Sequence, residues 1–110
     1  MRNHLKLLLL AGLLGVAPAR GEVDKKAERG WKSKCASCHG ADGKGQTDQG
    51  KKMKVTDMTS PAWQKGKTDV QIKKGIEDGA KTADGEMEGY KDKLEPAQID
   101  ALVAYIRTLK

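Results

Sequence analysis

The sequence predicts an all-α domain of about four short helices, without a convincing strand. Near the C-terminus, four apolar residues recur at the i, i+3, i+4, i+7 spacing of one helix face: Ile99, Leu102, Val103 and Ile106. Such a stripe is typical of a helix that packs on a core. No run of β-branched or aromatic residues alternates with polar ones over the length of a strand. Helices joined by loops rich in glycine and lysine are therefore expected.

The N-terminal residues are typical of a secretory signal. A basic start is followed by an apolar run over residues 7–16 and by Ala17-Pro18-Ala19, whose small side chains suit cleavage after Ala19. A transmembrane helix needs about 20 apolar residues, and this run is shorter. We therefore expect residues 1–19 to be a cleaved signal peptide and residues 20–110 to be one exported, periplasmic domain. An uncleaved N-terminal anchor is the alternative.

The first helix of this domain is expected over residues 23–38. Ala27, Trp31 and Cys35 fall at i, i+4 and i+8 on one face of it. Four glycines then lie between positions 40 and 50. They predict a long irregular loop over residues 40–55, of a kind that is acceptable in a small domain when it wraps a cofactor.

Start and stop signals predict three further helices. Ser60, followed by proline, is an N-cap pattern that predicts a short helix. Thr68 and Gln71 have capping-box spacing, and Gly79 is expected to end the helix that they begin. The last helix starts near Pro96 and carries the apolar stripe described above.

The most informative motif is Cys35-Ala-Ser-Cys38-His39, which has the spacing of covalent haem attachment. Two thiols that far apart can reach two vinyl groups of one porphyrin, and His39 then stands under the iron as its proximal ligand. A disulfide would leave His39 without a role. A thioredoxin-like pair would need a preceding strand. A zinc site would need about four ligands, and the chain beyond the leader offers too few sulfur and imidazole donors.

A second axial ligand to the iron would separate an electron carrier from a gas-binding or catalytic haem protein. Beyond the leader there is no histidine other than His39, so a second histidine ligand from the same domain is excluded. Met87 is the favoured candidate because it follows the turn-forming pair Asp84-Gly85, on a segment free to fold over a haem face. Met53, Met58, a lysine and an iron without a second protein ligand remain alternatives.

The composition indicates a small core and a basic surface. The chain has no phenylalanine, and 33% of its residues are charged. So small an apolar core needs additional stabilisation, which a covalently attached porphyrin would supply. The net charge of +6 predicts partners with acidic surfaces, or peripheral contact with an acidic membrane face, rather than nucleic acid.

These residues together resemble the class I c-type cytochromes, of the small soluble bacterial monohaem kind found in the periplasm. The resemblance covers nearly all of residues 20–110. It is carried by Trp31, by the motif from Cys35 to Gly43, by Trp63, Ile76 and Gly79, by Met87-Glu-Gly-Tyr90, and by residues 99–106.

The resemblance implies a cytochrome c-like fold around one covalently bound haem, in which the N- and C-terminal helices cross and Ala27 and Trp31 meet Leu102 and Tyr105. It also implies Met87 as the second iron ligand. The chain departs from the family pattern at three places. Ala27 stands where the family often has glycine, Glu88 follows the ligand methionine instead of proline, and Thr56 occupies the region whose carbonyl orients the proximal histidine.

The implied function is a monohaem one-electron carrier, with iron cycling between Fe(III) and Fe(II) among redox partner proteins, and not an enzyme. A peroxidase would need an open iron and a distal acid or base, and no distal histidine is available. A subunit of a larger membrane oxidase or dehydrogenase is the main alternative. A five-coordinate gas-binding haem protein is the other. We expect the carrier to be a monomer.

Overall fold

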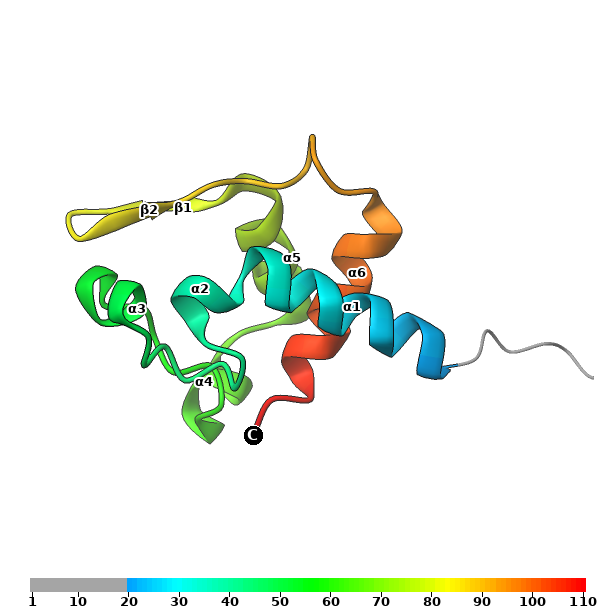
Figure 1. Cartoon of the computed structure of the whole chain (residues 1–110), viewed down its shortest axis with the longest axis horizontal. Helices are drawn as coiled ribbons and strands as arrows, with labels where there is room; N and C mark the ends of the chain where they lie inside the picture. The colour runs from blue at the N-terminus through cyan, green and yellow to red at the C-terminus, as the bar shows by residue number, and fades with distance from the viewer. Residues whose placement is uncertain (1–19) are drawn as a thin grey trace, which may run out of the picture.

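The structure, a computed structural model, describes residues 20–110; the predicted signal peptide lies outside them. These residues form six helices and one two-stranded hairpin (Figure 1). In chain order they are α1 (Arg20–Lys34), α2 (Ala36–His39), α3 (Asp48–Met53), α4 (Pro61–Gly66), α5 (Asp69–Asp78), β1 (Ala80–Thr82), β2 (Gly85–Met87) and α6 (Pro96–Arg107). The predicted helical fold class is confirmed.

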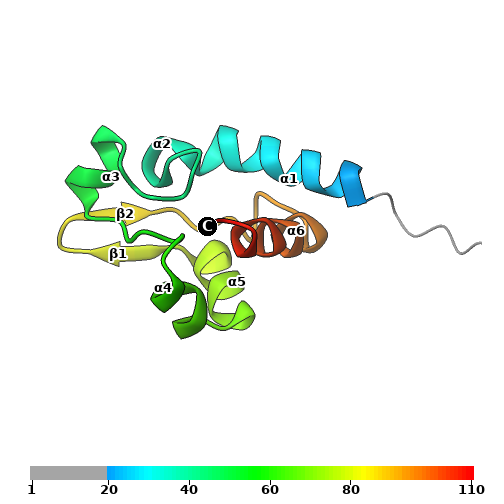
Figure 2. The ribbon, with the colours of Figure 1, turned by 90° about the horizontal axis from the view of Figure 1, so that it is seen from below.

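The first and last helices cross, as the resemblance implies. α1 lies against α6 in both views of the ribbon (Figures 1 and 2). At the crossing, the Trp31 side chain is only 1% exposed, and its ring centroid lies 5.8 Å from that of Tyr105. The predicted contact between Trp31 and the C-terminal stripe is therefore confirmed.

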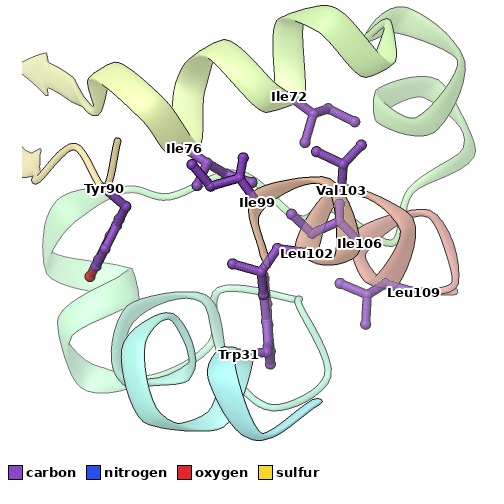
Figure 3. Close-up of a cluster of buried hydrophobic side chains, with 9 residues drawn as sticks. All are labelled: Trp31, Ile72, Ile76, Tyr90, Ile99, Leu102, Val103, Ile106 and Leu109. Atoms are coloured by element: carbon purple, nitrogen blue, oxygen red, sulfur yellow. The ribbon is translucent and has the colours of Figure 1, made fainter. Parts of the chain in front are cut away.

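The core joins α1, α5 and α6 (Figure 3). All four stripe residues of α6 are buried, and Ile72 and Ile76 of α5 are buried beside them. The cluster consists of Trp31, Ile72, Ile76, Tyr90, Ile99, Leu102, Val103, Ile106 and Leu109. The core thus occupies one end of the domain, while α2, α3 and the hairpin lie at the other end (Figure 1).

The predicted helix starts are confirmed by their hydrogen bonds. The Ser60 hydroxyl accepts from the Trp63 amide at 3.1 Å, with proline at the next position. Thr68 and Gln71 form the reciprocal capping box at α5, with distances of 2.9 and 3.1 Å. These side chains satisfy amide groups that the first helical turn leaves without partners.

The prediction of one helix over residues 23–38 was wrong in part. The helix breaks at Cys35, whose backbone angles of φ −116° and ψ −35° place it between α1 and α2. The Cys35 amide still donates to the Trp31 carbonyl at 2.8 Å, and the His39 amide donates to the Cys35 carbonyl at 3.0 Å. The break therefore redirects the chain without leaving these backbone groups unpaired.

The prediction of an irregular loop over residues 40–55 was also wrong in part, because α3 forms within it. Thr47 caps α3 by accepting from the Gly50 amide at 2.9 Å. Gly50 lies inside the helix for a packing reason, since a Cβ there would stand 2.2 Å from the Cys38 carbonyl oxygen. A glycine that indicates flexibility in the sequence thus permits close approach of two backbones.

The expectation that the chain has no strand was also wrong, because a short hairpin follows α5. β1 and β2 pair antiparallel, with Ala80 opposite Met87 and Thr82 opposite Gly85. Each strand has three residues, too few to show an apolar alternation in the sequence. The turn-forming pair Asp84-Gly85, already noted, is the local signal of this hairpin.

Candidate functional site: a cavity between the cysteine motif and the hairpin

The residues of the cysteine motif are held at the junction of α1 and α2. The Trp31 indole Nε1 donates to the Gly40 carbonyl at 2.9 Å, and the Gly45 amide donates to the His39 carbonyl at 2.8 Å. These bonds fix the backbone at His39 and at the residue that follows it. Cys35 and Cys38 are free thiols, both half-buried.

Two cavities meet at this motif, of about 400 and about 210 Å³. Both are lined by Cys35, His39, Met58, Trp63 and Met87. The larger cavity adds Cys38, Met53, Tyr90 and residues of the hairpin, and the smaller one reaches the apolar core. The fold therefore brings together the four residues that the sequence indicated as the site: Cys35, Cys38, His39 and Met87.

Burial keeps the His39 imidazole neutral, because it lowers the pKa of that ring below its usual value. A neutral imidazole has a free nitrogen lone pair for a metal. The His39 Nδ1 atom is buried without a hydrogen-bond partner in the described part of the chain. Thr56, the residue expected to supply a carbonyl near this ring, lines the larger cavity but makes no such bond.

Burial also raises the pKa of the Cys35 thiol to about 11, the nearby Lys34 opposing the shift only weakly. The thiol is consequently protonated at neutral pH, so this cysteine has no character of a reactive thiolate nucleophile. A structural role or a covalent attachment suits it better than redox catalysis through a thiolate.

The three candidate methionines differ in their surroundings. Met87 and Met58 line both cavities, whereas Met53 lines only the larger one. Met58 is held by its own backbone, since its amide donates to the Gly43 carbonyl at 3.0 Å and its carbonyl accepts from Gln64. Met87 enters from the hairpin, an element separate from the cysteine motif.

Sequence reasoning gave no role to the polar group beside Met87. The Tyr90 hydroxyl donates to Glu88 at 3.0 Å, and Lys93 pairs with the same carboxylate. Burial, followed by this hydrogen bond, raises the pKa of Tyr90 to about 12. Lys93 and Tyr90 in turn lower the pKa of Glu88. The sequence showed the motif from Met87 to Tyr90 but not this pairing, which depends on how the segment turns after β2.

The site suits a haem better than a metal ion held by protein atoms alone. Among the side chains of residues 25–110, no group of three or more His, Cys, Asp or Glu could hold a metal ion. A neutral imidazole, two neighbouring thiols and a cavity continuous with apolar residues fit a porphyrin whose iron needs few protein ligands. None of the helices in this part of the chain is long and apolar enough to cross a membrane.

The chain is similar to two curated proteins that are subunits of larger assemblies. It is 33% identical over 97 residues to the cbb3-type cytochrome c oxidase subunit FixP of Azorhizobium caulinodans, and 27% identical over 97 residues to FixP of Bradyrhizobium diazoefficiens. In both cases the match covers 88% of this chain but 31% of the relative. The chain thus spans about a third of the length of these relatives.

Solved structures with the same fold are also c-type cytochromes. The KustC0563 c-type cytochrome matches with a TM-score of 0.68 and 30% identity, over 76% of this chain and 96% of that one. Cytochrome CL of Methylophaga aminisulfidivorans MPT, at 20% identity and a TM-score of 0.60 over 82% of this chain and 55% of that one, supports the fold alone. The family model described as cytochrome c matches residues 25–110. The chain therefore belongs to the cytochrome c family, an electron-transferring family with covalently bound haem c and its iron.

Proposed function

We propose that the protein is a periplasmic one-electron carrier, with haem attached through Cys35 and Cys38 and with His39 and Met87 as axial iron ligands. The observation that supports this most is the shared lining of the two cavities by Cys35, His39 and Met87. When bound, the haem supplies an iron that alternates between Fe(III) and Fe(II), so that one electron is accepted and released without a substrate.

The chain's own residues hold and orient the ligand imidazole. We assign His39 Nε2 as the coordinating atom, because Nδ1 is the nitrogen sealed from solvent. The bond from Trp31 to the Gly40 carbonyl and the bond from Gly45 to the His39 carbonyl hold the backbone on which this ring stands. Such outer contacts keep a ligand at one orientation while the charge on the metal changes.

Apolar side chains line the part of the site that adjoins the core. Trp63 lines both cavities, and the smaller one continues to buried core residues such as Ile72 and Leu102. An apolar wall disfavours the additional positive charge of the ferric state, so it raises the reduction potential, in the same direction as methionine ligation. No general acid or base is needed for this role.

The location and the partners are part of the same proposal. The signal-like residues 1–19 support export and cleavage after Ala19. The chain's net charge of +6 falls to +4 when Arg2 and Lys6 are removed with them, and this remaining positive charge supports redox partners with acidic docking surfaces. We propose a monomeric domain of residues 20–110. The mass of the purified holoprotein, with the N-terminus determined, checks the cleavage, and light scattering checks the oligomeric state.

The similarity to FixP supports a second candidate, namely a haem domain that works within a cbb3-type oxidase assembly. Cell fractionation separates the two functions. A free carrier is released with the periplasmic contents, whereas an oxidase subunit stays with the membranes and co-purifies with oxidase activity after detergent extraction.

The ligand assignment is tested by comparing Met87→Leu with Met58→Leu. Leucine conserves the volume of methionine and removes the sulfur, so both variants should fold. The oxidised wild type should show a weak band at about 695 nm, where methionine bound to ferric haem absorbs. Met87→Leu should lose the band and bind carbon monoxide readily when reduced, whereas Met58→Leu should retain the band. The opposite pattern would assign the ligand role to Met58.

A further inference from the structure

We propose that Met53 and Gly85 form a contact that docks the hairpin tip on α3 and so positions Met87. Met53 is then a positioning residue and not an iron ligand. The inference rests on the proposed role of Met87, because positioning has a consequence for the iron only if Met87 binds it. Figure 2 shows α3 lying beside β2.

Gly85 is glycine because of its neighbour and not because of its backbone. Its φ lies outside the left-handed region, so another residue could adopt its conformation. A Cβ at this position, however, would lie 2.8 Å from Met53 Cγ and 3.3 Å from Met53 Cβ. Met53 Cβ is fixed to the backbone of α3, whereas Cγ and the nearest atom, Cε at 2.7 Å, could be cleared only by turning the Met53 side chain out of this contact.

Met53 also reaches the cysteine motif, since its Sδ atom lies 3.8 Å from Cys38 Sγ. The side chain therefore bridges the attachment site and the hairpin tip. A flexible, polarisable thioether suits such a position between irregular surfaces. Here its packing contacts account for its location, without any bond to a metal.

A second contact closes the same junction. Lys54, the residue that ends α3, adopts a left-handed conformation with φ +55°, which is unfavourable for lysine. Its Nζ atom lies 3.6 Å from Asp84 Oδ1 at the hairpin tip. The ion pair is exposed and weak by itself, but it joins the same two elements as Met53 and Gly85.

The base of the hairpin is held independently by α5. The Tyr90 amide donates to the Ile76 carbonyl at 2.8 Å, and the Lys91 amide donates to the Glu77 carbonyl at 3.2 Å. The tip has no comparable backbone bonds to α3, and strands of three residues are only marginally stable by themselves. Docking on Met53 therefore adds a second point of attachment, at the tip, for β2, whose other end carries Met87 opposite Ala80.

A double-mutant cycle on the holoprotein tests the contact, using Gly85→Ala, Met53→Ala and the double variant. The readout is the rate at which cyanide binds to the ferric protein, because cyanide enters where Met87 releases the iron. Gly85→Ala should raise this rate about tenfold when Met53 is present, and much less in the Met53→Ala background, where the added methyl group has room. Equal effects of Gly85→Ala in the two backgrounds would overturn the proposal.

Two further variants complete the design. Gly66→Ala is the matched control, since nothing lies within 4 Å of a Cβ at that position and its φ is not left-handed; it should leave the rate unchanged, and a similar acceleration would overturn the proposal. Met53→Leu should keep both the band at about 695 nm and the slow rate. Loss of the band in Met53→Leu would make Met53 a ligand and refute its positioning role.

Hydrogen exchange separates this inference from the ligand assignment. The paired amides of β1 and β2 should exchange faster in Gly85→Ala than in wild type, whichever residue binds the iron. If wild type lacks the methionine band but this acceleration is seen, the ligand assignment fails and the docking contact stands. If the band is present and the exchange of these amides is unchanged in Gly85→Ala, the docking contact fails while the ligand assignment stands.

Discussion

At the scale of single residues, the Trp31 side chain connects the helix crossing to the cysteine motif. Its ring centroid lies 5.7 Å from that of His39 and 5.8 Å from that of Tyr105. Its indole nitrogen donates to the Gly40 carbonyl. The same residue thus packs the helix crossing and holds the backbone next to the proposed iron ligand.

Two substitutions separate the packing of Trp31 from its hydrogen bond. Trp31→Ala should lower the free energy of unfolding by about 3–5 kcal/mol, as expected for a large buried aromatic residue. Trp31→Phe retains much of the ring but removes the indole hydrogen bond to the Gly40 carbonyl, which still accepts from the Gly43 amide at 3.1 Å. Loss of that one bond should cost about 0.5–1.5 kcal/mol. Denaturant unfolding of the holoprotein measures both. If Trp31→Ala lowered the free energy of unfolding by less than about 1 kcal/mol, the helix crossing would not depend on this side chain.

At the scale of elements, the junction between α5 and the hairpin depends on two glycines that face backbone. Gly79 ends α5 with φ +74°, and a Cβ there would lie 2.2 Å from the Met87 carbonyl oxygen. A Cβ on Gly89 would lie 2.5 Å from the Glu77 carbonyl oxygen. Gly79, which marks the end of α5 in the sequence, is therefore also the residue against which the Met87 backbone packs.

Gly79→Ala should consequently be strongly destabilising, because it combines a left-handed backbone with a clash against backbone atoms that cannot rotate away. We expect a loss of at least about 2 kcal/mol in unfolding free energy, together with a weaker methionine absorption band. Gly66→Ala, at an open position, should change stability by less than about 1 kcal/mol. Denaturant unfolding and the visible spectrum test both. Equal stability of the two variants would contradict the close packing at Gly79.

The turn that leads into α4 should make stability sensitive to acid. Asp57 accepts from the Thr59 hydroxyl at 2.6 Å and from the Thr59 amide at 2.8 Å, and these bonds lower its pKa. A carboxyl group whose pKa is lower in the folded state stabilises the fold above its unfolded pKa of about 4. That contribution is lost as the pH falls through the lower, folded value.

The test of this turn compares Asp57→Asn with wild type in unfolding experiments between neutral and acid pH. The variant should be less stable at neutral pH, and the difference should shrink as the pH falls through the acid range. Asp92→Asn is the control, because Asp92 is exposed and makes no side-chain hydrogen bond or ion pair to residues 25–110. A difference that stays constant with pH would show that the carboxylate charge of Asp57 is not involved.

At the scale of the whole molecule, the core is too small to stabilise the site end of the domain. The buried cluster lies among α1, α5 and α6, whereas α2, α3 and the hairpin surround the cavities. The hairpin residues of β1 are exposed. A group that fills the cavities would join the two ends, so the attached haem is expected to contribute much of the cooperativity of folding.

Replacing both Cys35 and Cys38 by alanine should therefore abolish covalent haem and leave a largely unfolded chain. Mass spectrometry and the pyridine haemochrome spectrum measure attachment, and thermal unfolding followed by circular dichroism measures folding. A haem-free double variant that melts in one sharp transition would show that the protein core suffices. Conversely, covalent haem in the double variant would show that Cys35 and Cys38 are not the attachment residues.

Much of this protein could be predicted from local patterns. The N-cap pattern at Ser60, the capping box of Thr68 and Gln71, and the i, i+3, i+4, i+7 stripe predicted α4, α5 and α6 respectively. Helix starts and buried helix faces can be predicted in this way because they depend on residues close in sequence. The cysteine motif predicted a haem, since attachment chemistry is local as well. The fold class and the cofactor followed from these observations and from the family resemblance.

The tertiary structure alone decided how distant segments meet. Gly50 and Gly85 indicate loops in the sequence, yet one lies in a helix against the Cys38 carbonyl and the other under Met53. The hairpin and α3 are too short for periodicity to reveal them. The sequence determined which groups are available to bind the haem. Only the packing of α3 and α5 against the hairpin determined where Met87 stands, because such contacts join residues that no local pattern relates.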